Sequence, residues 1–260
     1  MPRVGSVTVL SEASGLLRRT RRAPSPTPRY RLATDEWVRR NRVSISLRPA
    51  RATIEIARSA PADRPLDPVS VALFAMAVSA AGSARPSLWF DEAATISAST
   101  RTVPQLWRML GNIDAVHGLY YLLMHGWFAV FPATEFWSRL SSAVAVGLAA
   151  AGVVVLGRQL STRRVALAAG LVFALLPRVT WAGIEVRSYA LTMVAAVWLT
   201  VFCVVAVRRN GPRWWLGYGV LAFIATLLNV FLVLLVGVHA VVVAVSGRSW
   251  ALWRRWAVAA

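Results

Sequence analysis

Lysine is absent from the sequence and acidic residues are few, although the chain is strongly basic. All 29 basic residues are arginines, and only 11 acidic residues oppose them, which gives a formal net charge of +18. A soluble chain with this charge would be expected to bind nucleic acid. The exclusive use of arginine, however, is also what GC-rich coding produces, and we therefore expect no nucleic acid partner.

Cysteine is almost absent as well, and charged residues are scarce overall. The single cysteine, Cys203, excludes a disulfide within the chain and a zinc site built on cysteines. Charged residues make up 15% of the chain and hydrophobic residues 57%, with a mean hydropathy of +0.55. In average soluble domains about a quarter of the residues are charged. The composition therefore argues against a single soluble domain and for a protein with several membrane spans.

Uncharged stretches of about the length of a bilayer span recur after residue 67. The longest contains 34 residues, 214–247, and as one helix it would measure about 50 Å against a hydrocarbon core of about 30 Å. Two short spans that meet near Asn229 fit this stretch better. The expected spans are 68–84, about 136–157, about 165–182, 188–207 and the two within 214–247, which makes about six.

Two regions follow from this pattern. Residues 1–67 hold fourteen arginines, six acidic residues and clusters of proline and serine, without sustained apolar periodicity. They predict a disordered, arginine-rich cytoplasmic tail that anionic headgroups attract, although an extension without a role fits equally well. No apolar run follows the arginines within 18–22, so we expect no secretory signal peptide. Residues 68–260 are expected to form an all-α transmembrane domain.

The arginines are distributed unequally between two sets of connections. The connections 158–164, 208–213 and 248–255 hold nine arginines and no acidic residue, whereas 85–139 and 178–188 hold six arginines and five acidic residues. Short cytoplasmic loops carry an excess of arginine, so the first set is expected in the cytoplasm. The second set then lies at the outer face of what we expect to be a bacterial plasma membrane.

The external segment 85–135 is not an ordinary loop. Within it, residues 118–131 are apolar and aromatic but too short and too polar for a span. They predict an interfacial helix along the outer leaflet, with tyrosines and tryptophans at headgroup depth.

Two adjacent carboxylates, Asp91 and Glu92, follow the first expected span. Carboxylates at a membrane surface are costly unless they are used or paired. Position alone fits a solvated pair of loop acids as well as a functional pair.

Further polar side chains precede the second span. Asp114, His117, Tyr121 and His125 occur there, and the last three fall on one stripe of a helix at intervals of four residues. Interfacial packing is the better explanation of His125. Asp91, Asp114 and His117 could converge on a divalent metal ion, but their spacing matches no recognised metal site, so the sequence neither requires nor identifies a metal.

Arginines also occur at the outer ends of two spans, where the positive-inside rule does not expect them. Arg139 begins the second span, and Arg187 lies with Glu185 and Tyr189 in the connection before the fourth. Such arginines can snorkel to headgroup phosphates. A fixed guanidinium is also what a lipid-linked phosphate donor requires, because it binds two phosphate oxygens and stays charged.

These residues belong to longer patterns that follow one another along the chain. The patterns are Ser87-Leu-Trp-Phe-Asp-Glu-Ala93, Asp114-x-x-His117 with Leu119-Tyr-Tyr-Leu-Leu-x-His125-x-Trp127, Glu135-Phe-x-x-Arg139-Leu-Ser-Ser142 with Gly157-Arg-x-Leu160, and Glu185-x-Arg187-Ser-Tyr-Ala-Leu191. In this order they resemble the dolichyl-phosphate-mannose protein mannosyltransferase superfamily of GT-C glycosyltransferases, over roughly residues 68–246. Four ordered motifs on the expected sides of a membrane are more specific than any one of them.

The resemblance implies a GT-C-like bundle of about six spans with interfacial helices in the first external loop. It also implies an enzyme that transfers a sugar, expected to be mannose, from a polyprenyl-phosphate donor to a hydroxyl acceptor outside the membrane. The transfer would invert the anomeric carbon. The acceptor would be a protein, a lipoglycan or a lipid.

Such a displacement needs a carboxylate that takes the acceptor's proton and cations that stabilise the departing phosphate. We expect Asp91 to be the base, with Glu92 orienting it or supporting the acceptor. Arg139 and Arg187 are expected to bind the donor phosphate; Arg178 is less favoured because no motif residue accompanies it. A divalent metal ion could replace part of the cation role. The expected substrate-binding residues are Asp114, His117, Tyr121, Glu185 and Tyr189.

Two other classes remain open. A transporter-like protein would line its path with Glu185 and Arg187, but none of the expected spans holds an acid in its interior and no repeat of spans is evident. The other class is a non-catalytic membrane protein or an inactive fragment of such an enzyme. Residues 256–260 resemble the start of a seventh span, so the chain is expected to be an amino-terminal portion, truncated at its carboxy terminus.

Overall fold

The computed structural model describes residues 66–83, 86–246 and 250–260, all within one unit of the chain, Ala52–Ala260. These residues form helices joined by turns, and no strand occurs among them. The expected all-α class is therefore confirmed. The prediction of a disordered tail over 1–67 lies outside the described residues, except at its last two, which begin the first helix.

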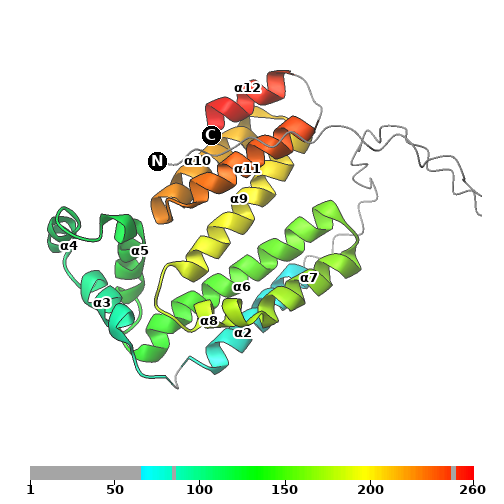
Figure 1. Ribbon diagram of the computed structural model, residues 1–260. Helices are drawn as coiled ribbons and strands as arrows, with labels where there is room; N and C mark the ends of the chain where they lie inside the picture. The colour runs from blue at the N-terminus through cyan, green and yellow to red at the C-terminus, as the bar shows by residue number, and fades with distance from the viewer. Residues whose placement is uncertain (1–65, 84–85, 247–249) are drawn as a thin grey trace, which may run out of the picture. The chain divides into compact units, whose positions relative to one another are not determined.

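The longest helix, α6 (Glu135–Leu160), lies at the centre of a helical bundle. It packs against α9 (Tyr189–Arg209) on one side and against α2 (Leu66–Ala81) and α7 (Arg163–Leu175) on the other (Figure 1). Small residues permit this packing, because a Cβ at Gly147 of α6 would lie 2.8 Å from a backbone oxygen of α2. In a bilayer, where lipid tails are as apolar as the side chains, such close packing is what holds helices together.

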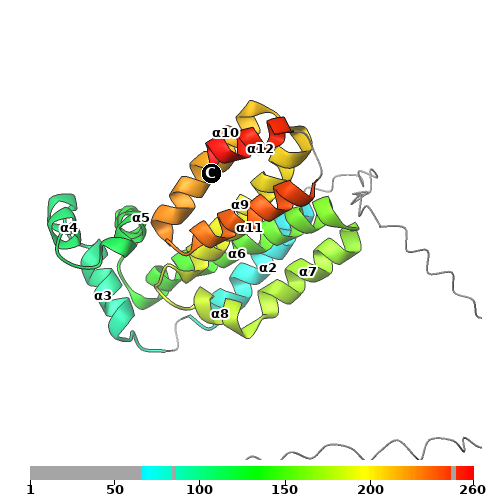
Figure 2. The same cartoon turned by 45° about the horizontal axis from the view of Figure 1, so that its top comes forward.

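Three further helices pack beyond α9: α10 (Pro212–Leu228), α11 (Leu232–Val245) and α12 (Trp250–Ala259) (Figure 2). The helices break near Asn229, where the two short spans are expected to meet, and it stays a prediction that both helices cross the membrane. The Asn229 side chain holds the turn, since its oxygen accepts a hydrogen bond from the backbone N–H of Phe231 at 3.1 Å.

The stretch 165–182 is not the continuous span that the sequence led us to expect. Helix α7 ends at Leu175, and α8 (Pro177–Gly183) follows at a bend of 62°. Proline lacks the N–H that a helix needs and disfavours helical geometry in the residue before it. Leu176 is accordingly extended, with a ψ of 127°.

Membrane-spanning length is reached by a minority of the described helices. By length and composition, α6 and α9 could each cross a membrane, and the bent pair α7 and α8 would be a third span. Helices α2 and α11 are apolar but shorter, with 16 and 14 residues. The described part of the chain is thus an all-helical membrane protein, and the total of about six spans stays a prediction.

The segment between α2 and α6 also folds into helices, namely α3 (Phe90–Ser99), α4 (Val103–Leu110) and α5 (Gly118–Phe128). Helix α5 coincides with most of the predicted interfacial helix and packs against α3. The imidazole Nδ1 of His125 donates a hydrogen bond to the carbonyl oxygen of Ser99 at 2.9 Å. This contact agrees with the packing role expected for that histidine, while the position of α5 along the membrane surface stays a prediction.

Charged side chains pair at both ends of α6. At one end Asp67 of α2 accepts a hydrogen bond from Arg163 at 2.8 Å and pairs with Arg158, and at the other end Arg139 pairs with Glu92 of α3. The stretch of α6 from Arg139 to Arg158 rises about 28 Å, close to the thickness of a hydrocarbon core. The bundle therefore holds its ion pairs one membrane thickness apart.

Candidate active site

A buried ion pair joins α3 to the start of α6. Arg139 donates hydrogen bonds to the Glu92 carboxylate from Nε to Oε1 at 2.9 Å and from Nη2 to Oε2 at 2.6 Å. The side chains of Arg139 and Glu92 are only 2% and 0% exposed. Neither charge would be tolerated there alone, because an unpaired buried ion costs several kcal/mol.

The remaining N–H groups of Arg139 bind backbone. They donate to the carbonyl oxygens of Ser83, Pro86 and Ser87 at 2.8, 2.6 and 3.1 Å. All five donors of the guanidinium are thus used by the protein, and Arg139 fastens the connection between α2 and α3 to α6. The sequence predicts Arg139 as a phosphate ligand, but in this arrangement it has no donor left for a phosphate.

Glu92 extends the same network to the connection after α8. Its Oε1 accepts a hydrogen bond from the backbone N–H of Val186 at 3.0 Å, and its Oε2 accepts one from the backbone N–H of Trp89 at 3.3 Å. With the two bonds from Arg139, the carboxylate is fully occupied. Glu92 therefore fixes both the helix that carries Asp91 and the residue next to Arg187.

Because Glu92 holds α3 against the connection after α8, Asp91 lies beside Arg187. The Asp91 Oδ2 is 3.8 Å from Nη2 of Arg187, with side-chain exposures of 41% and 17%. The roles expected from the sequence need the base Asp91 near a phosphate-binding arginine, and Arg187 lies at that distance. Unlike Glu92, the Asp91 carboxylate keeps open surface through which another molecule can reach it.

Asp114 forms the centre of a second polar group. Its backbone is left-handed, with a φ of 62°, a conformation that aspartate tolerates better than most residues. The carboxylate accepts hydrogen bonds from His117 Nδ1 at 2.6 Å and from the Tyr121 hydroxyl. Burial acts to raise the pKa of Asp114, but these hydrogen bonds and the nearby Arg187 charge outweigh it, so the pKa lies below its usual value. Arg187 is thus within electrostatic range of both carboxylates.

Glu185 and Tyr189 flank Arg187 in the chain. Burial raises the pKa of the Glu185 carboxyl, which is 5% exposed. Its Oε2 has no hydrogen-bond partner within the described residues. The Tyr189 ring lies under the guanidinium of Arg178, whose Cζ is 5.7 Å from the ring centroid. Arg178, less favoured from the sequence because no motif residue accompanies it, therefore lies against Tyr189, a residue of the fourth motif.

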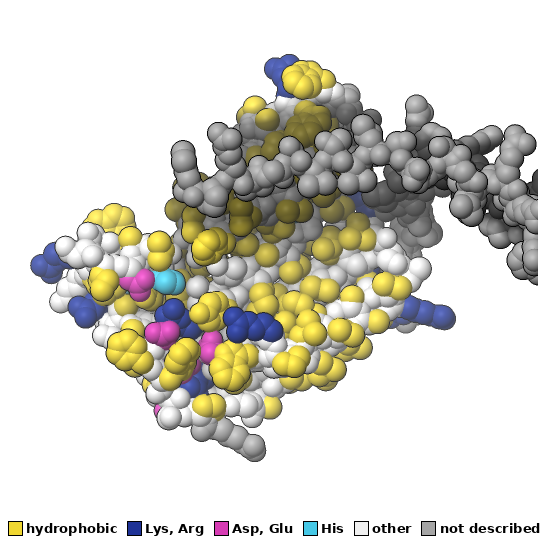
Figure 3. Space-filling view, in the orientation of Figure 1, with side chains coloured by type: hydrophobic (Ala, Val, Ile, Leu, Met, Phe, Trp, Pro, Cys, Tyr) yellow, Lys and Arg dark blue, Asp and Glu magenta, His cyan; other side chains and the backbone are white. Residues whose placement is uncertain are grey.

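Exposed charged side chains gather on one face of the molecule (Figure 3). In Figure 3 acidic, basic and histidine side chains cluster near α3, α5 and α8, with apolar side chains around them. No group of three or more His, Cys, Asp or Glu side chains in the described part of the chain could hold a metal ion. The convergence of Asp91, Asp114 and His117 as metal ligands is thus not found there.

No curated protein and no solved structure matches the chain. The profile of one family, described as dolichyl-phosphate-mannose-protein mannosyltransferase, matches residues 118–259. The match covers more than half of the chain and includes Arg139, Glu185 and Arg187, whereas Asp91 and Glu92 lie before it. The chain therefore belongs to the dolichyl-phosphate-mannose-protein mannosyltransferase family, a family of membrane glycosyltransferases.

Proposed function

We propose that the protein transfers a sugar, mannose in keeping with its family, from a polyprenyl-phosphate donor to a hydroxyl acceptor at the outer face of the membrane. The transfer is a single displacement that inverts the anomeric carbon. The observation that carries the proposal is the exposed Asp91 carboxylate 3.8 Å from Arg187, both held by the buried Glu92 and Arg139 pair. A base and a phosphate-binding cation are the two groups that this reaction needs.

Asp91 is the general base. As the acceptor oxygen bonds to the anomeric carbon, its proton passes to Asp91, and the bond between the anomeric carbon and the phosphate oxygen breaks. Arg187 binds the polyprenyl phosphate as negative charge grows on it. The contact between Asp91 and Arg187 is longer than a hydrogen bond and partly exposed, so opening it to admit the sugar costs little.

The surrounding residues have supporting roles. Arg178 and Tyr189 form a second cationic and aromatic surface for the donor, and the unpaired Oε2 of Glu185 accepts a hydrogen bond from a sugar hydroxyl. Asp114, with His117 and Tyr121 attached to it, binds the acceptor side. Glu92 and Arg139 position Asp91 and Arg187 without touching substrate. The proposal assigns the leaving-group charge to arginine and invokes no metal ion.

The orientation of the site follows from the arginines. The end of α6 that carries Arg158, together with Arg163 at the start of α7, belongs to the arginine-rich connections, which favour the cytoplasm. Arg139 lies at the opposite end of the same helix. The site beside it consequently opens to the outer face of the cell membrane, where a polyprenyl-phosphate donor and its acceptor would meet.

Transfer from radiolabelled polyprenyl-phosphate mannose tests the proposal. Membranes that contain the chain should label a hydroxyl acceptor, and the product should have the opposite anomeric configuration to the donor. Arg187→Lys keeps the charge but loses the planar fork for two phosphate oxygens, so it should raise the KM for the donor and slow turnover. The matched control is Arg101→Lys, since Arg101 is exposed in the same external segment.

Two results would contradict the proposal. One is labelling no greater than in membranes without the chain. The other is an Arg187→Lys variant that cannot be distinguished from Arg101→Lys, which would remove Arg187 from the donor site.

A further inference from the structure

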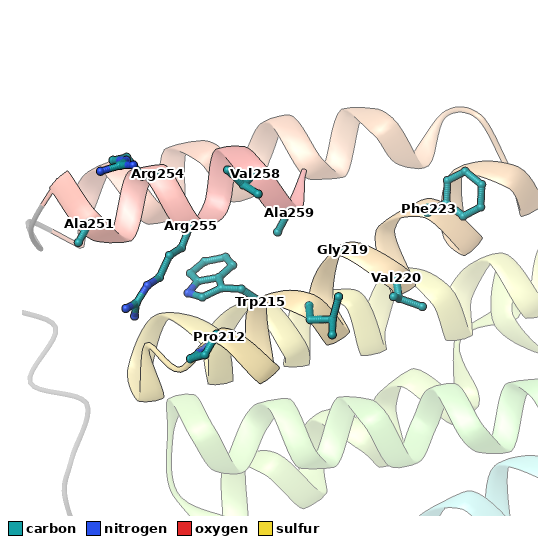
Figure 4. A pocket seen from close by; sticks show the side chains of 11 residues that line it. Pro212, Trp215, Gly219, Val220, Phe223, Ala251, Arg254, Arg255, Val258 and Ala259 are labelled. Atoms are coloured by element: carbon teal, nitrogen blue, oxygen red, sulfur yellow. The ribbon is translucent and has the colours of Figure 1, made fainter.

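A groove of about 820 Å³ lies between α10 and α12, apart from the residues of the proposed reaction (Figure 4). Its cationic end is near the carboxyl end of α9, because Arg255 donates a hydrogen bond to the carbonyl oxygen of Asn210. Arg187, by contrast, precedes the amino end of α9. The 21 residues of α9 rise about 30 Å, so groove and candidate active site lie at opposite ends of the bundle.

The groove is cationic at one end and apolar along the rest. Arg254 and Arg255 of α12 lie at one end, where the Arg255 side chain reaches toward Pro212 and Trp215 of α10 and the Arg254 side chain lies on the other side of α12 (Figure 4). Val220 and Phe223 line the other end. The walls away from the arginines therefore offer only apolar contacts.

No carboxylate from the neighbouring helices balances these arginines. The sequence contains no aspartate or glutamate after Glu185, so α9, α10, α11 and α12 carry none. Two further guanidiniums, those of Arg209 and Arg213, lie 4.9 and 5.3 Å from the Trp214 ring centroid at the start of α10. The groove thus opens at a cluster of positive charge that its own helices leave unneutralised.

Helix α12 has the composition of a helix at a membrane surface. Its ten residues include three tryptophans and two arginines, and Trp250 is 76% exposed while Leu252 is fully buried. Tryptophan rings and arginine guanidiniums lie favourably at headgroup depth. The composition of α12 therefore favours a position for the cationic end of the groove at the depth of lipid phosphates.

We infer that this groove binds an anionic phospholipid of the surrounding leaflet. Its phosphate lies against Arg255, near the charge of Arg254, and one acyl chain lies along Trp215, Val220 and Phe223. A small water-soluble anion would leave the apolar wall unused, and a wholly apolar ligand would leave the guanidiniums without a counter-charge. The inference does not depend on the proposed transferase activity.

Native mass spectrometry of the purified chain tests this site, with phosphatidylglycerol and phosphatidylcholine of the same acyl chains as probes. Phosphatidylglycerol should be retained preferentially. Arg254→Gln should weaken its binding about five-fold, as the loss of one arginine near lipid phosphate implies. Val220→Trp should weaken binding of the same lipid by filling the groove without changing charge; Val220 is 52% exposed, so its enlargement is tolerated by the fold.

The matched control is Arg164→Gln. Arg164 is an exposed arginine at the start of α7 and does not line the groove. It should leave phosphatidylglycerol binding unchanged. Equal retention of both lipids, an equal loss in Arg164→Gln, or retention of added polyprenyl phosphate in place of phosphatidylglycerol would each overturn the inference.

Discussion

Asp91 and Glu92 are neighbours in the sequence but have different surroundings, because successive residues of a helix point about 100° apart. Glu92 faces the bundle and accepts hydrogen bonds from Arg139 and from the backbone of Val186. Asp91 faces outward toward Arg187. Only the orientation of α3 distinguishes the structural carboxylate from the one that can meet a substrate.

Replacing Glu92 by glutamine should destabilise the fold. The amide leaves Arg139 buried without its counter-charge, which costs about 3–5 kcal/mol, and thermal unfolding in detergent would show this as a lower Tm. Glu135→Gln, which neutralises an exposed carboxylate of α6, is the control. An unchanged Tm together with lost transfer would instead place Glu92 in contact with substrate.

The hydrogen bonds of Asp114 should make the stability of the fold depend on pH in the acidic range. Its pKa lies below the usual value of about 3.9, so the carboxylate stabilises the fold above the unfolded-state pKa, and this contribution is lost as the pH falls through the folded-state value. The difference in Tm between wild type and Asp114→Asn should therefore be largest near neutral pH and shrink toward pH 3. A difference that grows with acid would contradict the hydrogen bonds from His117 and Tyr121.

The sequence could predict which residues come together, but not all of their uses. Its motif order brings Asp91 and Arg187 to one end of the bundle. It could not predict that the N–H groups of Arg139 all bind Glu92 and three backbone carbonyl oxygens. Those oxygens come within reach of Arg139 only when the connection after α2 has folded. A buried arginine and a ligand-binding arginine look alike in a sequence.

At the scale of elements, polar and proline residues mark the breaks that the hydropathy pattern leaves open. Asn229 ends α10 where the length of the apolar run requires a break. Pro177 breaks the stretch 165–182, whose hydropathy alone indicates one span. The second break could have been predicted from the backbone chemistry of proline, whereas the 62° angle depends on packing that no local pattern contains.

Close helix packing makes Gly147 sensitive to a single methyl group. A Cβ there would lie 2.8 Å from the carbonyl oxygen of Ala72, so Gly147→Ala should push α6 from α2 and cost about 1–3 kcal/mol. Gly237→Ala in α11 is the control, because a Cβ there meets nothing within 4 Å. Thermal unfolding should separate the two variants. Equal Tm values would mean that α2 and α6 accommodate the added methyl group without loss of stability.

At the scale of the molecule, the charges divide the bundle into two ends. The ion pairs of Asp67 lie at one end of α6 and the Glu92 and Arg139 pair at the other. Exposed apolar side chains cover the helices between them, among them Leu171, Val220 and Val238. A soluble protein rarely exposes so much apolar surface, so the arrangement fits a chain embedded in lipid.

Thiol labelling can determine which end faces outward. Ser97 in α3 and Ser161 after α6 are both exposed, and the native Cys203 is buried. In intact cells an impermeant reagent should label Ser97→Cys, whereas Ser161→Cys should be labelled only after lysis. The reverse pattern would place the candidate active site in the cytoplasm and contradict the proposed donor side.

The turnover of Asp91→Asn tests whether Asp91 is the general base. Asparagine is nearly isosteric but cannot accept the acceptor's proton, so transfer at saturating donor and acceptor should fall by about 10²–10⁴-fold while donor binding is retained. Glu135→Gln, in the same assay, should keep its turnover. Near-normal turnover of Asp91→Asn would show that Asp91 is not the base and would contradict the proposed displacement.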